Sequence, residues 1–167
     1  MKHIKNCVAT FFYCGYAPKA PGTFGTLGAV ILYFLLTKFF FHTNPSYTFP
    51  TMLILLLLAS IGNVWIGPWA ENHFHKKDPK QVVIDEVAGY FLTVLFFQPT
   101  WELMLIAFCL FRLFDITKPY PIHKVEKLPQ GWGILMDDLV AACYAIVVLI
   151  GLSYFQILNI QFITFIK

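Results

Sequence analysis

The residues most able to do chemistry are five carboxylates that lie in or beside apolar segments: Asp85, Glu86, Asp115, Asp137 and Asp138. An ionised residue left unpaired at the centre of a bilayer costs about 2.5–3.5 kcal/mol on insertion scales. Carboxylates that share one face of a membrane also repel one another, which raises their pKa values unless a cation lies among them. Oxygen ligands suit Mg²⁺, which binds through one or two carboxylates together with water and substrate phosphate. The five acids are therefore candidate ligands of a shared Mg²⁺.

Four of the five acids form two pairs of adjacent residues, Asp85 with Glu86 and Asp137 with Asp138. In a helix Asp85 and Glu86 point about 100° apart, so one could bind a metal while the other contacts a neighbouring helix or orients a water. Asp137 and Asp138 follow a Gly-Trp-Gly turn and open an apolar run. The alternative for both pairs is that the acids face the cytosol and stabilise a helix N-terminus through the helix dipole.

The basic residues nearest to the acids could hold a phosphate. Arg112, the only arginine in the chain, precedes Asp115 by three residues, so the two can pair on one helix face. Arg112 could grip a phosphate in a bidentate manner, and the alternative is a structural ion pair. Lys118 follows one turn later, either as a phosphate contact or as a lysine whose stem lies along apolar surface.

Glycine recurs at every third position in the segment from Gly22 through Gly25 to Gly28. Free backbone N–H groups at a helix start, beside the hydroxyls of Thr23 and Thr26, form a cradle for an anion such as phosphate. Thr23, Gly25 and Thr26 are therefore candidate phosphate contacts. The alternative is a face of small residues that allows helices to pack closely.

These residues lie in a strongly apolar chain, which is 58% hydrophobic and only 13% charged. A helix needs about 20 mostly apolar residues to cross a bilayer. Five stretches come near this length: residues 24–41, 51–70, 82–97, 102–117 and 139–158. The third and fourth contain charged residues and must pack inside the bundle. We expect one all-α domain over residues 1–167, a polytopic membrane helix bundle of about five transmembrane helices with an N-terminal interfacial helix in residues 1–20.

The basic residues are distributed unevenly between the connections of this five-span arrangement. Nine of the twelve fall on one side: Lys2, Lys5, Lys19, Lys76, Lys77, Lys80, Lys118, Lys124 and Lys127. Lys167 alone falls on the other side, and Lys38 and Arg112 lie within spans. Cytoplasmic loops carry the excess of Lys and Arg, so the sequence predicts a cytoplasmic N-terminus. The acids then gather at the cytoplasmic face.

Four segments, in this order, closely resemble the phosphatidylglycerophosphatase A family: GYAPKAPGTFGTL, VVIDEVAGY, FRLFDITKPYPI and GWGILMDDLVAA. The resemblance extends over nearly the whole chain. It implies a Mg²⁺-dependent enzyme of bacterial phospholipid synthesis that hydrolyses phosphatidylglycerophosphate to phosphatidylglycerol and inorganic phosphate. The reaction would take place at the cytoplasmic face of the inner membrane.

The same resemblance assigns roles to the candidate residues. It implies that the metal and catalytic groups are the acids, with the catalytic work done by Asp85, Glu86, Asp115 and Asp138. It further implies that Thr23, Arg112 and Lys118 contact the phosphate. Which acid acts as the base and which as a metal ligand stays open, as does attack by water against covalent attack by an aspartate.

Two other classes of protein fit parts of the sequence. A small cation or proton transporter would use membrane acids, although it would spread them over the depth of the bilayer. A non-catalytic subunit could bind anionic headgroups through basic loops, but it would not need five convergent acids. We expect a phospholipid substrate and the membrane as partners and no nucleic acid, and the oligomeric state stays open.

Overall fold

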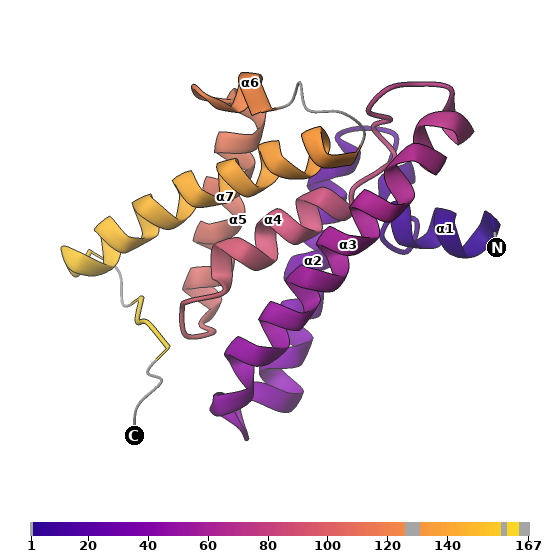
Figure 1. Cartoon of the computed structure of the whole chain (residues 1–167). Coiled ribbons are helices and arrows are strands. Elements are labelled where there is room, and N and C mark those ends of the chain that lie inside the picture. Colours follow the sequence, from indigo (N-terminus) through magenta and orange to yellow (C-terminus); the bar gives the residue numbers. More distant parts are fainter. Residues whose placement is uncertain (1, 126–130, 158–159, 164–167) are drawn as a thin grey trace.

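Helices dominate the computed structural model of the chain, which describes residues 2–125, 131–157 and 160–163 (Figure 1). The elements in chain order are α1 (Lys2–Ala9), η1 (Cys14–Tyr16), α2 (Pro21–Leu36), η2 (Thr37–Phe41), η3 (Pro45–Tyr47), α3 (Thr48–Phe74), α4 (Ile84–Val94), α5 (Trp101–Thr117), α6 (Ile122–Val125) and α7 (Gly131–Tyr154). Within the described residues there is no strand, only an isolated antiparallel bridge between Phe97 and Phe162. The predicted all-α class is confirmed.

Three segments are long and apolar enough to cross a membrane: Pro21–Phe41, Pro45–Phe74 and Trp132–Tyr154. Their most apolar windows are only 28%, 22% and 44% buried within the protein. Large aliphatic side chains such as Ile31, Ile61 and Val147 point outward with more than half of their surface exposed. Apolar surface on this scale marks a face that another apolar phase covers, which is consistent with a membrane protein.

The prediction of about five spans is wrong, because among the described residues three helices rather than five have the required length and composition. Helix α4 has 11 residues, so it is about 16 Å long against a hydrocarbon core of about 30 Å. Helix α5 has 17 residues and includes Glu102, Arg112 and Asp115. These charges leave it without an apolar stretch that could span the core.

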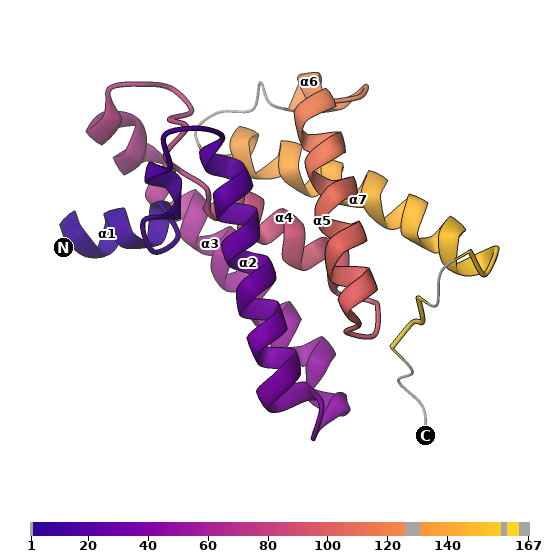
Figure 2. The same cartoon turned by 180° about the vertical axis from the view of Figure 1, so that it is seen from behind.

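Helix α4 is instead the enclosed centre of the bundle. Nine of its eleven residues are buried, and it packs against α2, α3, α5 and α7. Figure 2 shows it from behind, lying between α2 and α5 with α7 beyond. Gly89 allows α5 and α7 to approach closely, since a Cβ atom there would lie 2.5 Å from the ring of Phe111 on α5 and 3.2 Å from the carbonyl oxygen of Asp138 on α7. The short helix thus carries its two acids in protein rather than in lipid.

The four segments that the sequence singled out meet at one end of the bundle. Figure 1 shows the start of α2, the loop that leads into α4, the end of α5 and the start of α7 together in the upper part of the view. Helix α2 starts at Pro21, in the first helical turn where proline is well accommodated. Helix α5 ends at Thr117; the next residue, Lys118, caps it in a left-handed conformation and is followed by Pro119.

The N-terminal segment braces the loop between α3 and α4. Helix α1 packs against α3, where the Lys5 ammonium lies 4.9 Å from the centroid of the Trp65 ring. The backbone N–H of Val83 donates a hydrogen bond to the carbonyl of Ala9 (2.9 Å). Phe12, Tyr13 and Tyr16 in this region are exposed, and their predicted contact with the membrane interface stays a prediction. Lys127 and Lys167, which entered the orientation argument, lie outside the described residues.

Candidate active site

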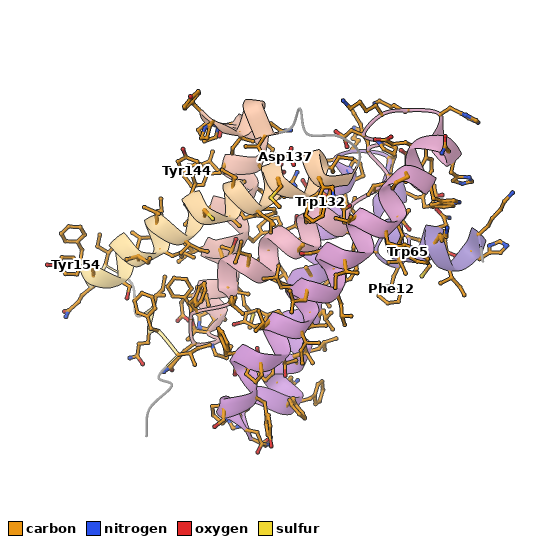
Figure 3. The ribbon with its side chains drawn as sticks, viewed as in Figure 1. Phe12, Trp65, Trp132, Asp137, Tyr144 and Tyr154 are labelled. Atoms are coloured by element: carbon orange, nitrogen blue, oxygen red, sulfur yellow. The ribbon has the colours of Figure 1, made fainter. Side chains whose placement is uncertain are left out.

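A cavity of about 210 Å³ opens at the end of the bundle where the four segments meet. Its charged lining consists of six acids and three basic residues: Asp78, Asp85, Glu86, Asp115, Asp137, Asp138, Lys80, Arg112 and Lys118. All five predicted acids are therefore brought together, and so are Arg112 and Lys118. Figure 3 shows Asp137 near the start of α7, far from Tyr154 at the other end of that helix.

Three of the acids form the tightest group. Asp85 and Glu86 on α4 and Asp138 on α7 each offer a carboxylate oxygen, and these oxygens all lie within 4.8 Å of one another. Asp85 is 4% exposed and Asp138 is 3% exposed. Asp115 and Asp137 line the same cavity but stand outside this group and pair with basic side chains.

The electrostatics of the group favour a bound cation. Burial raises the pKa of Glu86 to about 7 and raises the pKa of Asp85 well above its usual range, with the charge of Glu86 adding to the rise at Asp85. Glu86 Oε2 is buried and has no hydrogen-bond partner within the described residues. Among the described residues, six carboxylates and three basic side chains line the cavity, which is an excess of negative charge. An all-oxygen ligand set with a carboxylate oxygen still lacking a partner fits Mg²⁺.

Two of the basic side chains are held by acids of the same cavity. Arg112 Nη1 lies 2.6 Å from Asp115 Oδ2 and 3.8 Å from Glu86 Oε1, which confirms that Arg112 and Asp115 pair on α5. Arg112 Nε is buried without a hydrogen-bond partner in the described part of the chain, so it retains donor capacity. Lys118 Nζ donates to Asp137 Oδ2 at 2.7 Å, which joins the end of α5 to α7.

The glycine segment at the start of α2 approaches the site differently from the predicted cradle. Gly22 lines the cavity, whereas Thr23, Gly25 and Thr26 do not. The Thr26 hydroxyl is buried and donates to the carbonyl of Gly22 (2.9 Å). A Cβ atom at Gly25 would lie 2.6 Å from Cβ of Val83, as expected for a close-packing residue. The proposed phosphate contacts of these three residues stay predictions.

Seven of the residues that line the cavity did not enter the predicted site, and three of them bear on its chemistry. Asp78 and Lys80 come from the loop between α3 and α4, and Gly22 was considered only as a neighbour of Thr23. The available signal was the DPK sequence just before the VVIDE segment. Asp78 adopts a left-handed backbone conformation with φ of 52°, which aspartate tolerates better than most residues.

Comparison with known proteins identifies the chain's relatives. The family model described as Phosphatidylglycerophosphatase A matches residues 7–153. A protein of Bacteroides thetaiotaomicron, provisionally named a phosphatidylinositol-3-phosphatase, is 34% identical over 85% of this chain and 89% of its own length. Proteins named phosphatidylglycerophosphatase A from Haemophilus influenzae and Escherichia coli are 32% and 31% identical, over 91% and 90% of this chain and 90% and 81% of their own lengths. No solved structure matches. The chain therefore belongs to the phosphatidylglycerophosphatase A family and is a phosphatase that acts on a phosphate monoester.

Proposed function

We propose that the chain is a Mg²⁺-dependent lipid phosphatase that hydrolyses phosphatidylglycerophosphate to phosphatidylglycerol and inorganic phosphate in bacterial phospholipid synthesis. The observation that carries this proposal is the meeting of Asp85, Glu86 and Asp138 within 4.8 Å in one cavity. Arg112 and Lys118 line the same cavity, so groups that bind a metal and groups that bind a phosphate are adjacent. Because the chain belongs to a family of phosphatases, we set aside the two other classes considered for it, a transporter and a non-catalytic subunit.

In this proposal Asp85, Glu86 and Asp138 hold the metal ion. When bound, Mg²⁺ neutralises charge on the phosphoryl oxygens and lowers the pKa of a bound water. Arg112 and Lys118 orient the phosphate, since guanidinium and ammonium groups form strong charge-assisted hydrogen bonds with phosphate oxygens.

The chain's own acids then handle the protons. Asp85 or Glu86 accepts the proton of the attacking water as the oxygen of that water forms a new bond to phosphorus. The bond between phosphorus and the glycerol oxygen breaks, and the leaving oxygen takes up a proton to give the alcohol of the product lipid. A variant of this route has an aspartate attack phosphorus directly, and trapping of a phosphorylated enzyme in a quenched reaction distinguishes the two.

The proposed location is the cytoplasmic face of the bacterial inner membrane. The loop that lines the cavity carries Lys80 and continues from Lys76 and Lys77, and Lys118 stands at the end of α5. Basic residues mark the cytoplasmic side of bacterial membrane proteins. The cavity therefore opens toward the cytoplasm when the three candidate spans are inserted by this rule.

The test is phosphate release by the purified protein from phosphatidylglycerophosphate in neutral detergent micelles. We expect turnover with Mg²⁺, loss of turnover with a chelator, and a loss of at least about 10³-fold in Asp85→Asn, which removes a group that acts directly at the reacting centre. Glu71→Gln is the matched control, because Glu71 is an acid at the end of α3 outside the cavity. Turnover that survives both the chelator and Asp85→Asn would refute the proposed site.

Phosphatidylinositol 3-phosphate is a second candidate substrate, because a relative at 34% identity carries that name. Both lipids present a phosphate monoester on a polyol headgroup, so the same cavity chemistry serves either one. The comparison of kcat/KM for the two lipids decides between them, and a higher value for the inositol lipid would overturn the proposed substrate while leaving the proposed site in place.

A further inference from the structure

The three basic residues of the cavity differ in how they are paired. Arg112 and Lys118 are bound to acids, with distances of 2.6 Å to Asp115 and 2.7 Å to Asp137. Lys80 has no carboxylate oxygen within 4.0 Å of its ammonium among the described residues, and its side chain is exposed where it lines the cavity. Within the described part of the chain, Lys80 is thus the basic residue of the cavity that forms no ion pair with an acid.

The backbone that carries Lys80 is held on both sides. Pro79 is buried, and its carbonyl accepts a hydrogen bond from the N–H of Val82 (2.9 Å). The N–H of Val83 binds the carbonyl of Ala9 (2.9 Å). The loop therefore presents Lys80 from a fixed position, and a fixed donor loses less entropy when it binds a ligand than a donor on a freely moving loop.

The position of Lys80 along the cavity suggests which part of a substrate it meets. Asp85 and Asp138 are buried and Glu86 is half-buried, whereas the Lys80 side chain is exposed on the lining of the same cavity, so Lys80 lies nearer to solvent than the clustered acids do. A phosphate monoester that reacts beside these acids would place the rest of its headgroup toward solvent. In phosphatidylglycerophosphate the next charged group along the lipid is a phosphodiester.

We propose that Lys80 binds the phosphodiester of the substrate and so makes the enzyme select lipids that carry a diester as well as a terminal monoester. This inference rests on the proposed function of the cavity. Phosphatidylinositol 3-phosphate also carries a diester, whereas phosphatidic acid has a monoester alone. Lys80 should therefore favour both headgroup-bearing lipids over phosphatidic acid and contribute little to the reaction of the monoester itself.

The test compares the wild type with Lys80→Met, which keeps the length of the side chain and removes its charge. A charge-assisted hydrogen bond to phosphate, discounted for its exposed position, corresponds to a loss of about 5- to 20-fold in kcat/KM for phosphatidylglycerophosphate. We expect most of this loss in KM and expect Lys80→Arg to restore it. Phosphatidic acid is measured as a substrate or, if it is not hydrolysed, as a competitive inhibitor, and its constant should change much less.

The matched control is Lys77→Met, which removes one positive charge from the same loop at an exposed position outside the cavity. Neutral detergent micelles keep the surface potential of the lipid phase the same for all variants. An equal loss for both lipids in Lys80→Met, or an equal effect of Lys77→Met, would overturn the role of Lys80. If the wild type hydrolyses none of these lipids, the proposed function fails instead, so the two failures are distinguishable.

Discussion

Replacing Gly22 with alanine should separate activity from stability. Gly22 is buried in the first turn of α2, and a Cβ atom there would lie 2.0 Å from Glu86 Oε1 and 3.2 Å from Arg112 Nη1. In Gly22→Ala the carboxylate of Glu86 must therefore retreat by at least about 1 Å to reach an ordinary van der Waals separation. Such a shift moves a carboxylate of the acidic cluster away from Asp85 and Asp138.

The expected magnitudes follow from which atom has to move. The end of a glutamate side chain yields easily, and alanine is favoured over glycine in a helix by about 1 kcal/mol, so the free energy of unfolding should change by no more than about 1 kcal/mol. A misplacement of about 1 Å in a catalytic constellation can cost about 100-fold in rate. We expect kcat/KM to fall by about that factor while the melting temperature in detergent stays close to that of the wild type.

Two further glycines supply the comparison. In Gly25→Ala the new Cβ would lie 2.6 Å from Cβ of Val83 and 3.3 Å from its carbonyl oxygen. These atoms belong to a stiff side chain and to backbone, so overpacking should destabilise the protein by about 1–3 kcal/mol. At Gly151, inside α7, nothing lies within 4 Å, so Gly151→Ala should leave activity unchanged and raise the free energy of unfolding by no more than about 1 kcal/mol. Full activity in Gly22→Ala, or a stability loss there as large as in Gly25→Ala, would refute the proposed closeness of Gly22 to the reacting groups.

Three more outcomes are expected from the geometry of the cavity. Mg²⁺ at about 100 times its dissociation constant should stabilise the protein by about 2.7 kcal/mol, which is measured as a rise in melting temperature. Asp138→Asn should abolish this rise, and an equal rise in that variant would mean that the ion binds elsewhere. Lys118→Met leaves the buried carboxylate of Asp137 without its lysine, so calorimetry should show a loss of about 1–3 kcal/mol, and an unchanged melting temperature would mean that the pair contributes nothing. In a chain stripped of its four cysteines, a membrane-impermeant maleimide on intact cells should label His42→Cys but not Lys77→Cys; labelling only at Lys77→Cys would reverse the predicted orientation.

The sequence predicted the members of the cavity better than the shape of the bundle. Charged residues are costly in apolar segments, so Asp85, Asp115 and Asp138 stood out from their surroundings, and the structure brings all three to one cavity. The spacing of Arg112 and Asp115 was also sufficient to predict their ion pair, because residues three apart share one face of a helix.

The number of spans could not be obtained in this way. The local sequence of an apolar helix looks the same whether lipid or protein surrounds the helix. Only the length of the apolar stretch distinguishes a membrane span from a buried helix. The span predicted for this region covered residues 82–97, because apolar residues flank the helix on both sides. Helix α4 itself covers Ile84–Val94 and is enclosed by four other helices. That enclosure depends on contacts between distant segments, which the local pattern does not contain.

The same reason explains why Lys80 and Asp78 were missed. Their position depends on a loop held by the N-terminal segment, through the hydrogen bond from Val83 to Ala9 and through the close approach of Gly15 to the carbonyl of Gln81. Each of these contacts joins residues more than 60 positions apart in the chain. A local pattern could show that the loop is polar, but not that it turns toward the cavity.

The enclosure of α4 also bears on why the acids can be so close together. A carboxylate facing lipid would pay the full cost of leaving water, whereas Asp85 and Glu86 are surrounded by protein and open onto a polar cavity. Their remaining cost is mutual repulsion with Asp138, and the two paired basic residues of the cavity are already engaged by Asp115 and Asp137. In the proposed function, a divalent cation would offset that repulsion and would bind the phosphate of the substrate. On this proposal, the carboxylates that repel one another without an ion are those that would hold the ion beside the substrate, and removing one acid of the cluster should lower activity far more than it lowers stability.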